Sequence, residues 1–273
     1  MLAPYTALLS ATAATAKVRR TSAGDEPHVL NGAFASLGIE NDHHWAWSNY
    51  KAVLRNLCSR LAAHRLIEIG GGRNPLFDPN EIKNLGVEMT VNDIAPCELA
   101  RLPQDYQTAC FDVAGDISAV EHLRGTFDFA FSRMVFEHVA DGKRAWANLY
   151  ELLAPGGTAL TFIPTLYSVP FLLNWLLPDK LATAIVTQLC PNRGDRGEPV
   201  FPARYSWCVA NEARLRPMLS RIGYREIVVQ PFYGHQYYRY VPIVRDLHEW
   251  FTGTARRRDL RMFASYAYIA ARK

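Results

Sequence analysis

The strongest constraint on the fold is a short apolar strand that runs directly into three consecutive glycines. Residues 65–69 have the composition of a buried strand, and Gly70, Gly71 and Gly72 follow it. Glycine allows a sharp turn and lets a ligand approach the backbone without a Cβ in its path. Three glycines alone are also typical of an ordinary tight turn between a strand and a helix. The feature therefore predicts a strand–turn–helix unit that is suited to holding a ligand.

A second strand gives the glycine turn a partner. Residues 87–92 form another apolar run, and Asp93 ends it, 21 residues after Gly72. Nucleoside-binding α/β folds place a carboxylate at this point, where it accepts hydrogen bonds from the ribose hydroxyls. An acid at the end of a strand is often simply solvated, so the prediction rests on the turn and the acid together. The pair indicates a ligand that contains a nucleoside.

The remaining chain alternates strand and helix patterns, which predicts βαβ units. Further strands are expected at about 106–111, 127–131, 158–163, 226–230 and 266–271, and helices at about 45–63, 146–153, 211–221 and 244–251. The last two strands are expected to form an antiparallel hairpin at one edge. We therefore predict an α/β, Rossmann-like fold with a seven-stranded, mostly parallel sheet and helices on both faces.

The predicted fold leaves two segments outside the strand–helix alternation. Residues 1–44 are expected to be an N-terminal tail and irregular segment, and 45–273 the α/β domain. Residues 165–210 are expected to form a helical insertion, a lid, after the fifth strand. Its apolar stretch, 169–178, is too short to span a bilayer. This stretch fits the lining of a ligand pocket, a helix at a membrane surface, or the core of the lid.

The composition excludes several classes of protein. With 49% hydrophobic and 21% charged residues, the chain of 273 residues can fill a globular core. A net charge of +4 is too small to predict nucleic-acid binding. Five scattered cysteines without a Cys-x-x-Cys pair favour a reducing compartment over a disulfide framework or a zinc site. We expect a cytoplasmic location, with peripheral membrane contact through 169–178 as an addition. For residues 1–20, a frayed tail is favoured over a transit peptide.

Several short motifs occur in the order that a known family shows. They are Glu68-x-Gly70-x-Gly72, Asp93, Asp112-Val113, the strand 127–131 followed by Ser132, Phe136-Glu137-His138-Val139, and Leu152-Leu153-Ala154-Pro155-Gly156-Gly157. This set, within about residues 60–165, resembles the class I S-adenosylmethionine (SAM)-dependent methyltransferases. The resemblance is greatest to the broad small-molecule group sometimes called type 11. Asn74 departs from the family, which often has a third glycine there, and this affects the expected shape of the loop.

The resemblance implies a SAM site along the strand ends. The glycine turn would cradle the methionine part, Asp93 would bind the ribose, and Asp112 would accept the adenine amino group. Ser132 and Arg133 would lie near the methyl donor. The full implied set is Glu68, Gly70, Gly71, Gly72, Asp93, Ile94, Asp112, Val113, Ser132 and Arg133.

Two histidines are candidates for a general base, and His235 is the first choice. His235 lies in an aromatic segment, 233–238, after the sixth strand, where strand-end loops usually shape the ligand crevice. His138 belongs to a Glu-His-Val triplet that one quinone-forming subgroup uses to hold a metal, together with a carboxylate three residues before the Glu. Met134 stands at that earlier position, so no metal site is predicted. A packed His138 at the turn is the favoured alternative to a catalytic role.

These observations predict a metal-independent methyltransferase that uses S-adenosyl-L-methionine and releases S-adenosyl-L-homocysteine. The acceptor is expected to be a small or lipid- or sugar-linked molecule, bound under 165–210 and methylated on oxygen. Arg193, Arg196 and Arg204 could hold an anionic headgroup. No nucleic-acid partner is expected, because the Asn/Asp-Pro-Pro-Tyr/Phe motif is absent after the fourth strand. The alternatives are a silent SAM-binding scaffold and an NAD(P)-dependent oxidoreductase, which Pro75 disfavours by replacing the third glycine of the dinucleotide fingerprint.

Overall fold

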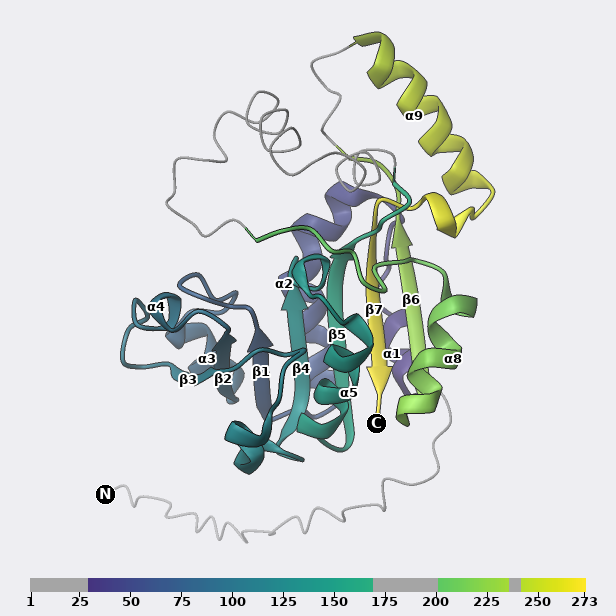
Figure 1. Cartoon of the computed structure of the whole chain (residues 1–273). Helices are drawn as coiled ribbons and strands as arrows, with labels where there is room; N and C mark the ends of the chain where they lie inside the picture. Colours follow the sequence, from purple (N-terminus) through teal and green to yellow (C-terminus); the bar gives the residue numbers. More distant parts are fainter. Residues whose placement is uncertain (1–28, 169–200, 236–241) are drawn as a thin grey trace, which may run out of the picture.

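A seven-stranded sheet runs through the protein in the order β3-β2-β1-β4-β5-β7-β6 (Figure 1). The computed structural model describes residues 29–168, 201–235 and 242–273. The strands are β1 (Arg65–Ile69), β2 (Glu88–Asp93), β3 (Gln107–Cys110), β4 (Phe127–Arg133), β5 (Leu153–Pro164), β6 (Glu226–Phe232) and β7 (Tyr266–Arg272). Strands β1 to β5 pair in parallel with their neighbours in the sheet, whereas β7 is antiparallel to both β5 and β6. The predicted Rossmann-like, mostly parallel sheet and its edge hairpin are confirmed.

Helices cover both faces of this sheet (Figure 1). One face carries α1 (Val29–Ala35) and α2 (His43–Arg60), and the other carries α5 (Gly142–Leu152) and α8 (Glu212–Ile222). α9 (Pro242–Arg257) extends past the carboxyl ends of the parallel strands (Figure 1). The shorter helical elements are α3 (Pro79–Leu85), α4 (Pro96–Leu99), η1 (Ser118–Leu123), η2 (Phe136–His138) and η4 (Arg261–Phe263).

Local capping explains where the important helices begin and end. α2 begins at His43 because Asp42 Oδ1 accepts hydrogen bonds from the backbone N–H groups of His44 and Trp45, at 2.8 and 3.4 Å. α3 begins with a capping box between Asp78 and Glu81 and ends at a glycine in the left-handed conformation. The start of α2 is thereby fixed at the carboxyl end of the sheet, because α2 runs antiparallel to the β1 strand that follows it.

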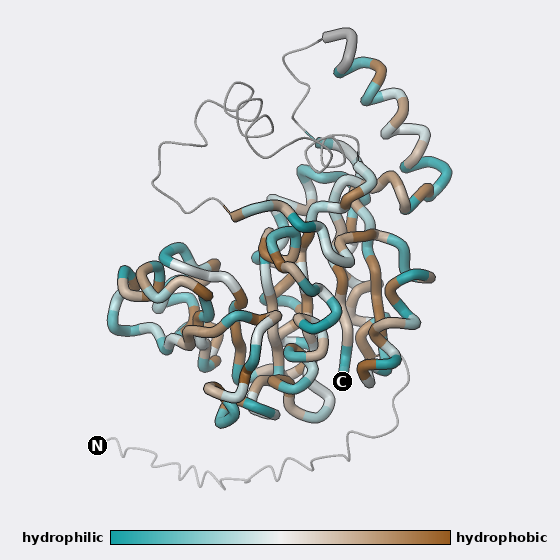
Figure 2. Tube along the Cα trace, viewed as in Figure 1, coloured by the Kyte–Doolittle hydropathy of each residue, from teal (hydrophilic) through white to brown (hydrophobic). Residues whose placement is uncertain are grey.

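The core lies between the sheet and the two helical layers. Phe129, Phe131, Phe162 and Tyr268 are almost completely buried on the central strands. Figure 2 shows the corresponding hydrophobic colour along these strands and a mixture of colours along α9. Each such side chain stabilises the fold by about 1.5–3 kcal/mol. The sheet is therefore a rigid support for the loops at its ends.

Two features differ from the sequence-based prediction. Residues 29–35 lie in the segment expected to be irregular, yet they form α1, because Leu30 and Phe34 bury against the sheet. The break expected at residues 155–157 does not lie between α5 and the strand that follows it, β5. β5 already begins at Leu153, and the glycines lie in an irregularity where the β4–β5 register shifts. Most of the predicted insertion, including 169–178, lies outside the described residues.

Candidate functional site

The glycine turn lies at the carboxyl edge of the sheet, directly after β1. Gly70 and Gly72 have φ angles of +68° and +50°, a left-handed backbone that favours glycine. Space is also restricted: a Cβ at Gly70 would lie 2.5 Å from Val135 Cγ2, and one at Gly72 would lie 3.1 Å from Asp93 Oδ2. At this turn, glycine backbone without a Cβ therefore lies against side chains from the ends of β4 and β2. We call this group of Gly70, Gly72, Asp93 and Val135 the donor edge.

Asp93 presents a fixed carboxylate at the donor edge. Its Oδ1 accepts a hydrogen bond from the backbone N–H of Ala95 at 2.8 Å. Burial, together with the negative charge of Glu98, raises the pKa of Asp93 from its ordinary value. Glu98 itself is held by Arg73, with 2.5 Å between Nε and Oε2. The second oxygen of Asp93, Oδ2, lies beside Gly72 and is suited to accept a hydrogen bond from a ribose hydroxyl.

Glu68 supports the turn from below. Its side chain is buried, and both of its carboxylate oxygens accept from the backbone N–H of Leu76, at 2.9 and 3.2 Å. Burial raises the pKa of Glu68 to about 7, against the opposing effect of that hydrogen bond. These hydrogen bonds tie Glu68 to the loop that follows the glycines. Glu68 thus holds the shape of the turn.

The next strand ends extend the site towards the sheet edge. Asp112 follows β3, is exposed, and accepts a hydrogen bond from the backbone N–H of Ala114 at 2.8 Å. Val113 beside it is buried, and Asn148 Nδ2 donates to its carbonyl at 2.8 Å. Ile94, which follows β2, is 52% exposed. Asp93 and Asp112 thus stand near the ends of two neighbouring strands, about 4.8 Å apart, where a nucleoside-binding α/β fold places its ligand.

The end of β4 forms the other side of the donor edge. Ser132 is fully buried and Arg133 is exposed. The Tyr50 hydroxyl, from α2, donates to the Ser132 carbonyl at 2.7 Å and fixes this strand end. Met134 then adopts a φ of +55°, an unusual backbone for a residue other than glycine. The strained turn directs Val135 against Gly70.

The C-terminal part of the predicted insertion, which includes Arg204, packs beside this turn. Residues 201–208 lie along η2: the backbone N–H groups of Arg204 and Tyr205 donate to the Glu137 carbonyl, at 2.6 and 2.9 Å. His138 Nδ1 lies 3.2 Å from the carbonyl oxygen of Pro202. Neither hydrophobic periodicity nor a motif marks this segment, because backbone contacts far apart in the sequence hold it. It is the described part of the predicted insertion that reaches the donor edge.

A surface formed by one exposed tryptophan over two buried aromatic rings continues the carboxyl edge from β4 to β7. The Trp47 side chain, from α2, is 43% exposed. Its ring packs edge-on against Phe162 of β5, with centroids 5.0 Å apart, and against Tyr266 of β7, at 5.9 Å. Phe162 is paired with Arg133 in the sheet, so this surface adjoins the end of β4. An exposed tryptophan here can contact a ligand that lies next to the donor edge.

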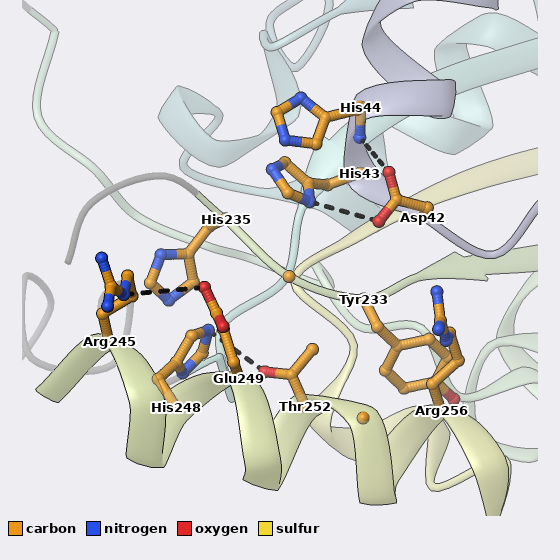
Figure 3. Close-up of a pocket in the computed structure, with 12 residues that line it drawn as sticks. Asp42, His43, His44, Tyr233, His235, Arg245, His248, Glu249, Thr252 and Arg256 are labelled. Atoms are coloured by element: carbon orange, nitrogen blue, oxygen red, sulfur yellow. Dashed lines mark hydrogen bonds and ion pairs between the residues drawn. The ribbon is translucent and has the colours of Figure 1, made fainter. Parts of the chain in front are cut away.

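A cavity of about 520 Å³ lies farther along the same edge, between the start of α2, the end of β6 and α9 (Figure 3). We call it the histidine cavity. It is lined by Asp42, His43, His44, Tyr233, Gly234, His235, Arg245, His248, Glu249, Thr252, Gly253 and Arg256. The imidazoles lie in two pairs, His43 with His44 at 3.9 Å between ring centroids and His235 with His248 at 4.0 Å.

The electrostatics of this cavity keep its buried imidazoles neutral. Burial and the neighbouring His248 and His43 lower the pKa of His235 to about 3. Burial also lowers the pKa values of His43 and His248. The Thr252 hydroxyl lies 3.1 Å from His248 Nε2. The cavity is therefore a polar site whose histidines can both donate and accept hydrogen bonds.

The sheet order separates the two predicted bases. His138 follows β4, at the donor edge, whereas His235 follows β6. Three strand spacings, about 14 Å, lie between the ends of β4 and β6. Sequence alone could not show this, since it does not specify that β7 inserts between β5 and β6.

Residues 29–168, 201–235 and 242–273 contain neither a metal-binding cluster nor a membrane-spanning helix. Within these ranges, no group of three or more His, Cys, Asp or Glu side chains is arranged to hold a metal ion. In the same part of the chain, every helix is too short or too polar to cross a bilayer.

Comparison with known proteins points to one kind of domain. Residues 67–161 match a family model described as "methyltransferase domain". The chain is 27% identical over 94 residues to phosphoethanolamine N-methyltransferase 2 of Caenorhabditis elegans. That match covers 34% of this chain but only 21% of the length of the relative.

Two solved structures of methyltransferases are similar to this chain. A Haemonchus contortus phosphoethanolamine N-methyltransferase 2, in complex with phosphomonomethylethanolamine and S-adenosylhomocysteine, is similar with a TM-score of 0.50 and 13% identity. The similarity covers 90% of this chain and 56% of that one. A SAM-dependent methyltransferase of Archaeoglobus fulgidus has a TM-score of 0.48 at 14% identity, covering 85% of this chain and all (100%) of that one.

Proposed function

We propose that this chain, which has the domain and fold of the class I SAM-dependent methyltransferases, transfers the methyl group of SAM to a hydroxyl of a small acceptor. One observation carries the proposal: the glycine turn, Asp93 and Val135 meet at the carboxyl edge with no room for a Cβ at Gly70. Bound SAM supplies an electrophilic methyl group. The protein contributes chiefly by aligning the acceptor, which is worth up to about 7–11 kcal/mol in favourable cases.

The surface beside the donor edge suits such an acceptor. Trp47 offers an exposed aromatic ring next to the end of β4, and residues 201–208 pack against η2. An acceptor with an apolar part would cover Trp47 and exclude water from the methyl group. A lipid-linked acceptor and membrane contact remain part of this proposal. Both depend on 169–178, which lies outside the described residues. The cytoplasmic location is likewise a proposal, which the fold does not test.

We assign the base first to His138 and second to His235. The position of His138 after β4 supports this order, as does the contact of its ring with the Pro202 carbonyl, which orients the imidazole. His235 has a pKa of about 3 and lies at the end of β6, so it is a weaker and more distant base. A base of this kind typically contributes about 10²–10⁴-fold to the rate.

A nitrogen acceptor is the second candidate. The curated relative is named as a phosphoethanolamine N-methyltransferase, and an amine needs less help from a base than a hydroxyl. Both candidates share the donor edge and differ in the role of His138. A silent SAM-binding scaffold would share the donor edge too, but would transfer no methyl group.

The test uses SAM that carries a ¹³C-labelled methyl group, with the purified full chain and metabolite fractions that contain alcohols, sugars and amines. The carbon chemical shift of the product distinguishes methyl on oxygen from methyl on nitrogen. We expect an oxygen-linked methyl group, and a loss of about 10²–10⁴-fold in kcat for His138→Gln with unchanged affinity for S-adenosylhomocysteine. A nitrogen-linked product would favour the second candidate. Cofactor binding without any labelled product would favour the scaffold.

A further inference from the structure

The exposed apolar side chains of the described residues gather on α9 and the turn that follows it. Seven large apolar side chains are exposed in this part of the chain, and four of them lie within residues 247–262. Leu247 and Trp250 on α9 are 65% and 66% exposed, the highest values of the seven, and Leu260 and Met262 follow the helix. A concentration of exposed apolar side chains marks a surface that contacts another protein or a membrane.

Leu247 and Trp250 lie on the side of α9 that faces away from the histidine cavity. His248, Thr252 and Arg256, each four residues after the last, line that cavity and mark the polar side of the helix (Figure 3). Since an α-helix turns by about 100° per residue, Leu247 and Trp250 are centred roughly 170° around the axis from this stripe. We call the side that carries them the outward face of α9. The helix itself extends past the carboxyl ends of the parallel strands (Figure 1).

The carboxyl end of α9 adds positive charge to the outward face. Arg257 follows Trp250 by seven residues, or two helical turns, and Arg258 comes directly after it. Both side chains are exposed, as is that of Arg256. Within the described residues these three arginines form no ion pair, and Arg257 Nη2 donates to the neutral Thr254 hydroxyl at 3.1 Å. Their charge is therefore available to a partner of this surface.

The acidic side chains near this end of the molecule are paired or face elsewhere. Asp246 Oδ1 lies 2.7 Å from Arg245 Nη2, and Asp259 Oδ2 lies 2.9 Å from Arg261 Nε. Glu249 lines the histidine cavity, on the other side of α9, with Arg245 4.0 Å away (Figure 3). Residues 242–258 carry four arginines against two acids, which leaves a net charge of +2 when histidine is neutral. The outward face is therefore apolar at its centre and basic at one end.

We propose that the outward face of α9 docks on the surface of an anionic lipid bilayer. The acyl region takes up Leu247 and Trp250, and lipid phosphates pair with Arg257 and Arg258. Tryptophan suits this depth because its ring is apolar while its N–H can bond to a headgroup or to water. The docking needs no methyl transfer and is separate from the membrane contact proposed for 169–178. Because the other side of α9 lines the histidine cavity, the docked helix holds the carboxyl edge of the sheet beside the bilayer.

Vesicle flotation with the full chain tests the docking. The vesicles consist of phosphatidylcholine alone or with about one quarter phosphatidylglycerol, and Kd values follow from lipid titration. We expect the anionic vesicles to bind at least about tenfold more tightly than the neutral ones, and the difference to shrink as salt is added. Equal affinity for the two kinds of vesicle would contradict the role of the arginines.

The apolar contact is tested by the double variant Leu247→Ser with Trp250→Ser. Serine removes the apolar area, and we expect binding to anionic vesicles to fall at least about tenfold. Leu247→Ile with Trp250→Phe keeps an apolar side chain at both positions and should retain most of the affinity. Both wild-type side chains are about two-thirds exposed, so the fold should tolerate either pair of substitutions, which thermal unfolding checks.

The charged contact is tested by Arg257→Gln with Arg258→Gln. Each arginine at an anionic surface contributes about fivefold, so we expect binding to weaken about 25-fold. Arg60→Gln with Arg221→Gln is the matched control, because it removes the same charge from exposed arginines at the ends of α2 and α8. These helix ends lie before the amino ends of β1 and β6, at the opposite edge of the sheet. The control should bind as the wild type does.

An absence of binding to anionic vesicles would overturn the proposal. Binding that survives Leu247→Ser with Trp250→Ser would overturn it as well, because the contact would then lie on another segment. Sedimentation of the chain without lipid provides a third test: a dimer that this double variant dissociates would show that a second copy covers the outward face instead. Methyl transfer to water-soluble acceptors is measured without vesicles, so the proposed function stands or fails separately.

Discussion

Among single residues, Glu68 is a carboxyl group whose pKa the fold raises well above its ordinary value. It is buried beneath the glycine turn, and burial raises its pKa from 4.5 to about 7. A carboxyl group whose pKa is higher in the folded chain binds more protons there than in the unfolded chain. Its contribution to stability is therefore complete below about pH 4.5 and is lost as the pH rises through about 7.

The variant Glu68→Gln isolates this effect. Glutamine keeps an oxygen that can accept from the Leu76 N–H but cannot become charged. We expect its free energy of unfolding to rise by about 3 kcal/mol relative to wild type between pH 5 and pH 8, measured by urea denaturation at both pH values. A difference between the two proteins that stays constant over this range would contradict the assigned pKa.

Gly70 tests the shape of the donor edge. Gly70→Ala places a Cβ at 2.5 Å from Val135 Cγ2, whereas Gly86→Ala has almost the same φ, +66°, and open space around the new atom. Both substitutions strain the backbone by about 1–2 kcal/mol. We expect only Gly70→Ala to lower the affinity for S-adenosylhomocysteine, measured by calorimetry. The second substitution Val135→Ala should restore part of it; equal affinities for Gly70→Ala and Gly86→Ala would contradict the geometry.

Among the elements, the contact between the start of α2 and α9 depends on neutral histidines. The ring of His235 lies between the two helices, beside His248 of α9 (Figure 3). The charged groups around them are Asp42 on the α2 side and Arg245, Glu249 and Arg256 on α9. Because the pKa values of His43, His235 and His248 are lowered in the folded chain, opening of the cavity takes up protons.

Acidification should therefore release α9. Docking is unaffected above about pH 6.5, the ordinary pKa of histidine, and weakens as the pH falls towards 3, the value for His235. We expect amide hydrogen exchange in α9, corrected for its intrinsic pH dependence, to increase between pH 7 and pH 5. α8, which packs against α5, serves as the internal control. Protection of α9 that follows α8 at every pH would show that the histidines do not hold it.

The same elements show how far the sequence determines the fold. Hydrophobic patterning predicts the strands, although β3 only weakly, because Gln107–Cys110 is short and mostly exposed. The motif spacing predicts the order of the strand ends that form the donor edge. α1 was missed because it has only two turns and Gly32 interrupts its pattern. The histidine cavity was missed for a different reason: it is made of short polar segments from α2, β6 and α9 that only the tertiary fold brings together.

For the molecule as a whole, the parts of the candidate functional site lie along one edge of one sheet. The donor edge lies where β1, β2 and β4 end, the aromatic surface of Trp47 lies over β5 and β7, and the histidine cavity lies where β6 ends. Parallel strands bring their carboxyl ends to one side, which allows these three parts to face the same ligand space. Methyl transfer to any acceptor depends on the binding of the methyl donor at the donor edge.

Calorimetric titration with S-adenosylhomocysteine tests that central claim most directly. The wild-type chain is compared with Asp93→Asn, which keeps an oxygen for the Ala95 N–H but removes the carboxylate, and with the exposed control Asp246→Asn. We predict binding by the wild type and the control, and an affinity about 10–100-fold lower for Asp93→Asn, because hydrogen bonds to a charged group are worth about 1.5–3 kcal/mol. Binding of NADH in place of S-adenosylhomocysteine, or equal affinity in all three proteins, would contradict the account.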